Sequence, residues 1–308
     1  MTSPLFRIGQ VLRGKSGSNQ AKQPVIIKSV LGHPRVENER DILNRFQNNT
    51  SCLRPLLDEI KDPPKPTTIV LRHLEDDLSR ATRKRPLGRK EINFVSRRIL
   101  EALRCLHEGG YVHADIKPDN IFVNYTKKAG LDSEVRFSEI QLGDLGGLCH
   151  IDSKWATSGT PLGTPIWRSP EMVMETPWGT PADIWSFGAM LIYLIYGGDF
   201  NLFNPTTVPY DHEEYSLEVL KQQFRYFGPW PGKYDEIASP ETVRAIVWIM
   251  REIPKSDTTP FSLVSEKEVR KEDKRFIMDI MKMDWRDRPT ARELLEHDWF
   301  REGGVVEV

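Results

Sequence analysis

The sequence predicts an α+β fold of two lobes, a small strand-rich lobe followed by a larger, mostly helical one. Short β-rich runs separated by Gly, Ser and Pro clusters occupy about the first 75 residues, and helical spacing of apolar residues dominates after Leu78. A chain of 308 residues is long enough for such a bilobal unit. We place the N-terminal lobe at about residues 5–74 and the C-terminal lobe at about residues 75–300. The cleft between them falls near Arg72–Asp77, and such clefts are preferred ligand sites.

In the N-terminal lobe, we expect two strands at Val25–Ile27 and Thr68–Leu71. Between them, Val36–Phe46 carries apolar residues among charges, a pattern that is compatible with one short amphipathic helix.

The C-terminal lobe begins with a long helix over Arg89–His107, where apolar residues recur in steps of three and four and two glycines follow. Residues 111–148 return to short apolar runs with turns, and residues 148–168 form a loop rich in Gly, Ser, Thr and Pro. Further helices are predicted over Pro181–Tyr196, Ser216–Tyr226, Pro240–Ile253, Lys274–Met283 and Thr290–Phe300.

The composition is that of an ordinary globular protein, with 39% hydrophobic and 28% charged residues. Forty-three basic residues face forty-four acidic ones, and the formal net charge is −1. Because a nucleic-acid-binding domain usually carries a basic excess, we expect no nucleic-acid partner.

No targeting or membrane signal is visible in the sequence. Residues 1–10 lack the charged and apolar regions of a secretory signal, and the most apolar run, Ala189–Tyr196, is far short of the ~20 residues that span a bilayer. Three widely spaced cysteines suggest reduced thiols rather than a disulfide framework or a metal knuckle: Cys52, Cys105 and Cys149. We therefore expect a soluble intracellular protein of the cytoplasm or nucleus, with no membrane partner. The sequence leaves its oligomeric state open.

Residues Gly9–Ser16 satisfy the phosphate-binding P-loop pattern GxxxxGK[ST]. A P-loop follows a buried strand and opens a helix, yet only eight residues precede Gly9 and the segment after Ser16 is a poor helix start. We interpret the match as chance or as another glycine turn. A P-loop NTPase stays an alternative, and its nucleotide binding would depend on Lys15.

The most informative cluster is His113–Asn120, which directly follows the long predicted helix. It resembles the catalytic loop H-R-D-x-K-P-x-N of eukaryotic protein kinases, with Ala114 where that family usually has Arg. The resemblance implies that Asp115 accepts the proton of the substrate hydroxyl, that Lys117 supports the transferring phosphate and that Asn120 holds a magnesium ion.

Asp144 lies in Gly143–Gly146, which is similar to the D-F-G motif of the same family with Leu in place of Phe. The resemblance assigns to Asp144 a second Mg²⁺ contact, and Asn120 and Asp144 offer the hard oxygens that Mg²⁺ prefers. The stretch between the two motifs is longer than usual, so we expect an inserted hairpin tip around Thr126–Glu134.

Three later segments complete the resemblance. Ser169–Glu171 stands where the family has A-P-E, Asp183–Gly188 matches D-x-W-S-x-G, and Arg288 matches an arginine that pairs with the glutamate of A-P-E. The resemblance implies that Asp183 braces the backbone of the catalytic loop and that Arg288 pairs with Glu171. Five signatures in the family's order identify the chain as a protein kinase domain over residues 1–308, with a bilobal protein-kinase-like fold.

Within the N-terminal lobe, the strand ending at Lys28 resembles the V-A-I-K strand of kinases, which implies that Lys28 contacts the ATP phosphates. The alternative is an exposed strand-end lysine. Glu39 fits best as the acidic partner of Lys28, and Glu37 is the runner-up. By the same resemblance, the backbone of Arg72 and Leu74 would bind adenine.

Lys117 and Thr164 are typical of Ser/Thr kinases. The implied function is therefore transfer of the γ-phosphate of ATP, with Mg²⁺, to Ser/Thr hydroxyls of a protein substrate. Residues 163–171 and 226–229 loosely resemble the group of cyclin-dependent and SR-protein kinases.

The glycine-rich loop departs from the family pattern. No G-x-G-x-x-G-x-V precedes Lys28, and Gly14 is retained as a candidate phosphate contact in a degenerate or truncated loop. The short spacing from Lys28 to Glu39 predicts a helix that lacks a turn or enters at another angle. Two functions stay open, an active kinase and a pseudokinase that acts as a binding or scaffold module.

Ala114 also removes the arginine that would bind a phosphorylated activation loop. We therefore expect that activity does not depend on phosphorylation of three candidate hydroxyls: Thr157, Ser158 and Thr160.

Overall fold

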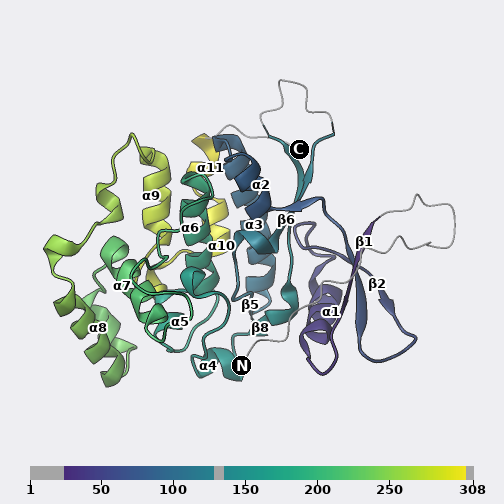
Figure 1. Cartoon of the computed structure of the whole chain (residues 1–308), viewed down its shortest axis with the longest axis horizontal. Helices are drawn as coiled ribbons and strands as arrows, with labels where there is room; N and C mark the ends of the chain where they lie inside the picture. The colour runs from purple at the N-terminus through teal and green to yellow at the C-terminus, as the bar shows by residue number, and fades with distance from the viewer. Residues whose placement is uncertain (1–23, 128–134, 303–308) are drawn as a thin grey trace.

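The computed structural model describes residues 24–127 and 135–302, and it shows the two lobes that the sequence predicts (Figure 1). The N-terminal lobe holds one helix, α1 (Arg35–Phe46), beside three strands: β1 (Val25–Ser29), β2 (Leu56–Ile60) and β3 (Thr68–Arg72). The C-terminal lobe is mostly helical, which confirms the predicted fold class. Residues 5–23 of the predicted N-terminal lobe, Gly14 and the P-loop pattern among them, lie outside the described residues.

The N-terminal sheet is antiparallel with the strand order β1-β3-β2. Lys28 on β1 pairs with Ile69 on β3, and Ile26 pairs with Leu71. Ile69 and Leu71 are buried because α1 covers one face of the sheet with its own apolar side. This packing fixes where Lys28 lies relative to α1.

A second small sheet joins the lobes. The strands β4 (Asp76–Asp77), β6 (Ile121–Tyr125) and β7 (Phe137–Leu142) lie in the order β4-β6-β7, and β6 and β7 form an antiparallel hairpin. Its tip falls within the predicted insertion and lies largely outside the described residues. At the other end of β7, Leu142 N donates to Cys52 O at 2.7 Å, so the loop before β2 is fixed to the C-terminal lobe.

Two long helices form the centre of the C-terminal lobe, α3 (Arg89–Glu108) and α6 (Pro181–Ile195). Residues of α6 from Ala182 to Leu194 are buried on all sides, whereas α3 buries one face. In Figure 1 the other helices surround this pair: α2 (Leu78–Lys84), α4 (Lys154–Thr157), α5 (Pro170–Val173), α7 (Tyr215–Phe227), α8 (Pro240–Glu252), α9 (Lys271–Ile280), α10 (Ala291–Leu295) and α11 (Trp299–Glu302). A two-stranded sheet of β5 (Tyr111–Val112) and β8 (Cys149–His150) closes the side near α1.

Most helix predictions agree with the structure to within one or two residues, but the prediction over Thr290–Phe300 is wrong in part. The segment forms two short helices, α10 and α11, with a break between them. A capping box of Thr290 and Glu293 starts α10, whereas Trp299 stacks on Phe276 with ring centroids 4.4 Å apart and donates to Asp273 at 2.7 Å. This tertiary packing of Trp299 overrides a continuous helix.

Three more local differences separate prediction and structure. The predicted helix over Lys274–Met283 begins and ends earlier, at Lys271–Ile280. Strand β2 was not predicted from its sequence LLDEI, because two acidic residues interrupt its apolar residues and the alternation is weak. The predicted loop over residues 148–168 contains the one-turn helix α4, which Ser153 caps by accepting from Ala156 N.

The three cysteines are free thiols. Within residues 24–127 and 135–302, the structure contains no helix with the length and apolar character needed to cross a membrane.

Candidate active site

Lys28, Glu39 and Asp144 converge in the cleft between the lobes. The Nζ atom of Lys28 lies 2.6 Å from Glu39 Oε2 and 2.6 Å from Asp144 Oδ1. Glu39 is 1% exposed, whereas the side chain of Asp144 is 39% exposed. Lys28 thus pairs with the buried carboxylate of Glu39 and with the accessible carboxylate of Asp144.

Lys28 and Asp144 keep each other ionised. Burial alone would lower the pKa of Lys28, but Glu39 and Asp144 outweigh it, so the pKa of Lys28 is raised. Burial likewise opposes ionisation of Asp144, and the Lys28 ammonium outweighs it, so the pKa of the Asp144 carboxyl is lowered. At neutral pH the cleft therefore presents one ammonium and one accessible carboxylate to a ligand.

Helix α1 reaches Lys28 in spite of the short connection. Asn38 Nδ2 donates to Gly146 O at 3.1 Å and to Leu148 O at 2.9 Å, which ties the helix to the segment that follows Asp144. A Cβ atom on Gly146 would lie 2.8 Å from Arg35 O, so only glycine permits this close approach. Of the two predicted partners, Glu39 contacts Lys28, whereas Glu37 accepts from Thr67 on the surface.

Asp115, Lys117 and Thr164 form a second cluster in the C-terminal lobe. Asp115 Oδ1 accepts from the backbone N and the Oγ1 of Thr164 at 3.0 and 3.1 Å. Lys117 Nζ lies 2.8 Å from Asp115 Oδ2 and donates to Thr164 Oγ1 at 2.9 Å. Such a carboxylate can accept a proton, and the ammonium beside it can stabilise a negatively charged group that is transferred at the same point.

Asp183 holds the backbone of this cluster. Its Oδ2 accepts from His113 N and its Oδ1 from Ala114 N, both at 2.8 Å, and His107 Nε2 lies 2.9 Å from Oδ2. Ala114 has a φ of 63°, a left-handed conformation that costs a non-glycine residue about 1–2 kcal/mol. Because Asp183 accepts both N–H groups, the strained turn before Asp115 is maintained, and this contact agrees with the prediction for Asp183.

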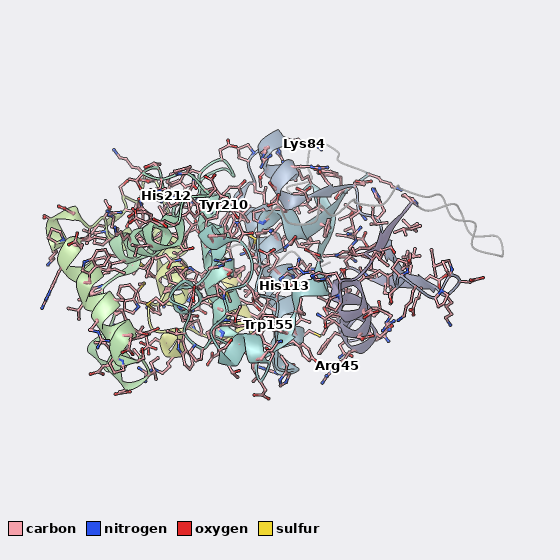
Figure 2. The ribbon with its side chains drawn as sticks, turned by 60° about the horizontal axis from the view of Figure 1, so that its bottom comes forward. Arg45, Lys84, His113, Trp155, Tyr210 and His212 are labelled. Atoms are coloured by element: carbon pink, nitrogen blue, oxygen red, sulfur yellow. The ribbon has the colours of Figure 1, made fainter. Side chains whose placement is uncertain are left out.

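His113 connects the two clusters. Its Nε2 lies 3.0 Å from Gly143 O and its Nδ1 accepts from Asp115 N at 3.3 Å. A carbonyl only accepts, so Nε2 carries the proton. Figure 2 shows His113 at the centre of the molecule, where the lobes meet.

Asn120 and Asp144 are the residues that fit a magnesium ion. The amide nitrogen of Asn120 donates to Asp115 O at 2.8 Å and to Asp115 Oδ2 at 3.2 Å, and no described residue donates to its Oδ1. The described residues contain no group of three or more His, Cys, Asp or Glu that could hold a metal by itself. An amide oxygen and an accessible carboxylate suit Mg²⁺, which commonly combines one or two protein oxygens with phosphate oxygens and water.

The predicted pair of Glu171 and Arg288 is formed and completely buried. Arg288 Nη1 and Nη2 donate to the two carboxylate oxygens of Glu171 at 2.7 and 2.8 Å, and the two side chains are 1% exposed or less. Arg288 also donates to Lys282 O and Pro181 O. This bidentate pair fixes α5 to the segment before α10.

The segment between Asp144 and Glu171 is held by apolar packing next to the catalytic cluster. Ala114 packs in a small buried cluster with Ala156, Trp178 and other apolar residues, and Trp178 Nε1 donates to Thr160 O at 3.0 Å. Arg168 donates to the carbonyls of Leu162 and Gly163. The side chain of Ala114 therefore contributes apolar packing at a position where the family usually has a charged arginine.

Arg54, which the sequence gave no reason to select, lies buried in the cleft and is 8% exposed. Its Nε donates to Arg72 O at 2.7 Å, and its Cζ lies 4.3 Å from the centroid of the Phe122 ring. Burial lowers the pKa of Arg54 to about 10 although Glu39 and Asp144 act in the opposite direction. No motif or spacing around Arg54, which lies between Leu53 and Pro55, predicts that its side chain is buried near Lys28 and Asp144.

Of the predicted adenine contacts, Arg72 is the last residue of β3 and Leu74 lies between β3 and β4. Leu74 is buried, and the side chain of Arg72 points to Glu139, with Nη2 2.8 Å from Oε2. The carbonyl of Arg72 accepts from Arg54, as described above.

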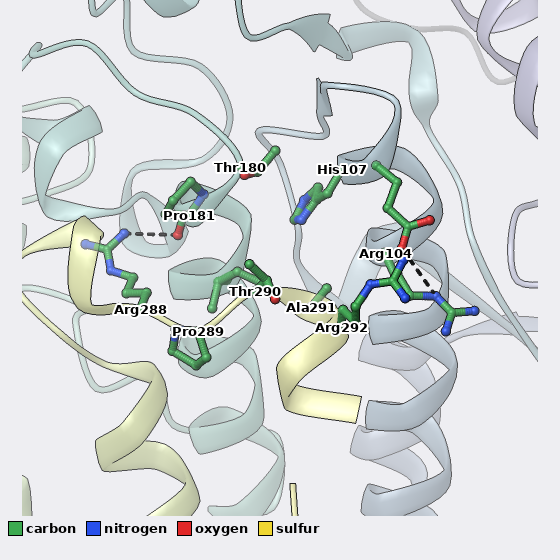
Figure 3. Close-up of a pocket in the computed structure, with 11 residues that line it drawn as sticks. Arg104, His107, Thr180, Pro181, Arg288, Pro289, Thr290, Ala291 and Arg292 are labelled. Atoms are coloured by element: carbon green, nitrogen blue, oxygen red, sulfur yellow. Dashed lines mark hydrogen bonds and ion pairs between the residues drawn. The ribbon is translucent and has the colours of Figure 1, made fainter. Parts of the chain in front are cut away.

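Two hollows lie near these clusters. One, of about 710 Å³, is lined by Lys117, Asn120 and Thr164 and extends to Trp167 and Asn204. The other, of about 290 Å³, lies between the end of α3, the start of α6 and α10 (Figure 3). Arg288, which pairs with Glu171, lines the second hollow, whereas Lys117 and Asn120 line the first, so the first is the one that opens onto the candidate site.

Comparison with known proteins agrees with this geometry. Residues 9–300 match the family model of the protein kinase domain. The Ser/Thr-protein kinase SMU1 of Mycosarcoma maydis is 37% identical over 107 residues, which cover 35% of this chain and 13% of that protein. The DNA damage response protein kinase DUN1 of Saccharomyces cerevisiae is 26% identical over 211 residues, which cover 64% of this chain and 40% of that protein. The chain thus spans less than half the length of these curated relatives.

Among solved structures, the chain resembles one in the crystal structure of the yeast RNA Pol II CTD kinase CTDK-1 complex. The TM-score is 0.70 at 18% sequence identity, and the match covers 91% of this chain and 86% of that one. At this identity the likeness concerns the fold alone. Because the family model matches residues 9–300, the chain belongs to the protein kinase domain family.

Proposed function

We propose that this protein transfers the γ-phosphate of ATP to Ser or Thr hydroxyls of a protein substrate. The observation that supports the proposal most strongly is the pairing of Lys28 with both Glu39 and Asp144 at 2.6 Å. In this pairing a cation lies beside an accessible carboxylate that would bind Mg²⁺. A polyphosphate needs these two groups, and the buried charge of Glu39 would be costly without Lys28.

In the proposed reaction, Asp115 accepts the hydroxyl proton of the substrate and Lys117 stabilises the phosphate during transfer. Asp115 Oδ2 and Lys117 Nζ are 2.8 Å apart, so the base and the cation act on the same small region. Asn120 and Asp144 would hold Mg²⁺, which neutralises charge on the phosphates when it is bound. Lys28 would orient the α- and β-phosphates, because Glu39 fixes its ammonium at the cleft.

A protein substrate has a route to this site. The hollow of about 710 Å³ begins at Lys117, Asn120 and Thr164 and is open to solvent. An extended segment with a Ser or Thr could lie there with its hydroxyl toward Asp115. Trp167 and Asn204, which line the same hollow, would contact residues beside the acceptor.

A pseudokinase that acts as a binding or scaffold module is the second candidate function. The position of Arg54 favours it, because this side chain donates to the carbonyl that adenine would use. The retained set of Lys28, Asp115, Asn120 and Asp144 favours catalysis.

The two functions separate in one assay. Transfer of labelled γ-phosphate from Mg-ATP to the protein itself and to a mixed Ser/Thr protein substrate is compared between the wild type and Asp144→Asn. A kinase predicts transfer by the wild type and background by Asp144→Asn. Equal, background-level signals from both proteins would reject the kinase and favour the pseudokinase.

A further inference from the structure

The end of segment 156–164 lies directly against Asp115. Thr164 donates to Asp115 Oδ1 from its backbone N at 3.0 Å and from its Oγ1 at 3.1 Å. A Cβ atom on Gly163, whose φ is 69°, would lie 2.2 Å from Ala114 O and 3.0 Å from Asp115 Oδ1. Because this approach leaves no free space, a shift of the residues before Gly163 would be transmitted to Thr164 and to Asp115.

Trp178 holds the first part of the same segment. Its backbone N donates to Ala156 O at 3.1 Å, and its Nε1 donates to Thr160 O at 3.0 Å. Trp178 is 6% exposed and Ala156 is completely buried, so water competes little for the bond between them. One residue therefore binds segment 156–164 at two points.

The Trp178 ring also packs beneath the turn that carries Asp115. It belongs to a small apolar cluster that includes Ala114, the residue before Asp115, and Ala156 from the segment. The cluster contains six buried residues: Val112, Ala114, Ala156, Met172, Trp178 and Ala182. The turn and the segment thus share one apolar support, and Trp178 is its largest side chain.

The backbone before Trp178 is itself firmly held. Thr176 donates to Glu171 O from its backbone N and from its Oγ1, both at 3.0 Å, and Glu171 belongs to the buried ion pair described above. A Cβ atom on Gly159, whose φ is 74°, would lie 2.2 Å from Glu175 O, so the turn of the segment fits closely against this backbone. Trp178 therefore extends from a fixed base to the segment that contacts Asp115.

We propose that Trp178 is a positioning residue for phosphate transfer, which holds segment 156–164 so that Thr164 keeps Asp115 in place. The inference rests on the proposed function, because it assumes that Asp115 is the base of the reaction. Trp178 does not line the hollow in which the substrate would lie, so it acts through the segment. Its contacts with the segment are neutral hydrogen bonds and apolar packing, so they need no charge on the segment.

The test is Trp178→Phe in the full chain. Phenylalanine keeps an aromatic ring and the backbone bond to Ala156 O, and it removes the Nε1 donor to Thr160 O. We expect kcat with a Ser/Thr protein substrate to fall about 10-fold to 100-fold, because small displacements of catalytic groups are costly. The affinity for Mg-ATP should stay within about twofold, since the described contacts of Lys28 and Asp144 do not include Trp178.

Hydrogen exchange on the same samples reports the position of the segment itself. Amides in residues 156–164 should exchange faster in Trp178→Phe than in the wild type, because the segment loses one of its two bonds to Trp178. Trp178→Leu also removes most of the ring from the cluster, so its kcat should fall further and its exchange should be faster still.

Trp299→Phe is the matched control. Trp299 is 1% exposed and its Nε1 donates to Asp273 at 2.7 Å, so the same substitution removes the same kind of buried bond. Figure 1 shows α11, which begins at Trp299, at the opposite end of the C-terminal lobe from α4. This variant should lose at least as much stability in urea as Trp178→Phe, but it should keep the wild-type kcat and the wild-type exchange in residues 156–164.

The outcomes distinguish this inference from the proposed function. If the wild type transfers phosphate and Trp178→Phe keeps its kcat within about twofold, the role of Trp178 is refuted and the kinase stands. The role is also refuted if kcat falls equally in Trp299→Phe, because the loss then follows general stability. If the wild type transfers no phosphate, both proposals are refuted. If Trp178→Leu fails to fold by circular dichroism, Trp178→Phe decides the question.

Discussion

Removal of the Asp183 carboxylate is the sharpest perturbation of the catalytic cluster that leaves the nucleotide contacts in place. Asp183 is completely buried and accepts from the backbone of His113 and Ala114 at 2.8 Å. In Asp183→Ala these two buried N–H groups lose their acceptors, each at about 1–3 kcal/mol. The free energy of unfolding should therefore fall by about 2–6 kcal/mol, a large part of the ~5–15 kcal/mol of a typical domain.

The same change should reduce kcat at least about 100-fold, because the strained turn at Ala114 sets the position of Asp115 and small displacements of catalytic groups are costly. Nucleotide affinity should change little, since Lys28 and Asp144 do not contact Asp183. Asp183→Asn retains one acceptor and should lie between the wild type and Asp183→Ala in both stability and kcat.

Urea unfolding and steady-state phosphate transfer measure the two effects, with Asp273→Ala as the matched control. Asp273 is also buried and accepts from Trp299 Nε1 and Arg89, but it belongs to α9, which Figure 1 shows away from the N-terminal lobe. Asp273→Ala should lose comparable stability and keep its kcat. The reasoning fails if Asp183→Ala loses less than about 1 kcal/mol, or if its kcat falls no further than that of Asp273→Ala.

Three more predictions follow from the charges and the packing around the cleft. Lys28→Met leaves the buried Glu39 carboxylate unpaired and should lower the free energy of unfolding by about 3–5 kcal/mol in urea, and the double variant with Glu39→Gln should recover much of that loss. The lowered pKa of Asp144 means that its ion pair stabilises the fold fully above the unfolded pKa of 3.8 and is lost as the pH falls through the folded value. The stability difference between the wild type and Asp144→Asn should therefore stay constant at neutral pH and shrink as the pH falls below 3.8 toward the lower folded pKa, and a difference that stays constant in acid would contradict this ion pair. Apolar contacts hold the segment beside Ala114, so phosphate transfer should survive the replacement of Thr157, Ser158 and Thr160 by alanine. Abolished transfer in this triple variant would show that activity needs phosphorylation of the segment.

Much of the C-terminal lobe was predictable from the sequence because its motifs combine local patterns with fixed order. The pairing of Glu171 with Arg288 and the contacts of Asp183 were expected, and the structure brings these side chains together. The break within the predicted helix over Thr290–Phe300 was not predictable, because it depends on a tertiary contact of Trp299 with Phe276.

The cleft shows the limit of local patterns more clearly. The short connection between Lys28 and Glu39 looked like a defect, yet Gly146 lets α1 approach and Asn38 fastens it. Arg54 could not be selected, because its position arises from β3, β6 and β7 meeting around one side chain, and no spacing along the chain encodes that.

The central claim is that Asp115 acts as the base in transfer of a phosphate to a hydroxyl. It is tested most directly by comparing the wild type and Asp115→Asn in single-turnover transfer from Mg-ATP to a Ser/Thr protein substrate, with nucleotide affinity measured on the same samples. An asparagine keeps an oxygen that can accept from Thr164, so the cluster should remain folded. We predict that the rate of transfer falls by several orders of magnitude and that nucleotide affinity is retained. Equal rates for the two proteins would contradict the role of Asp115.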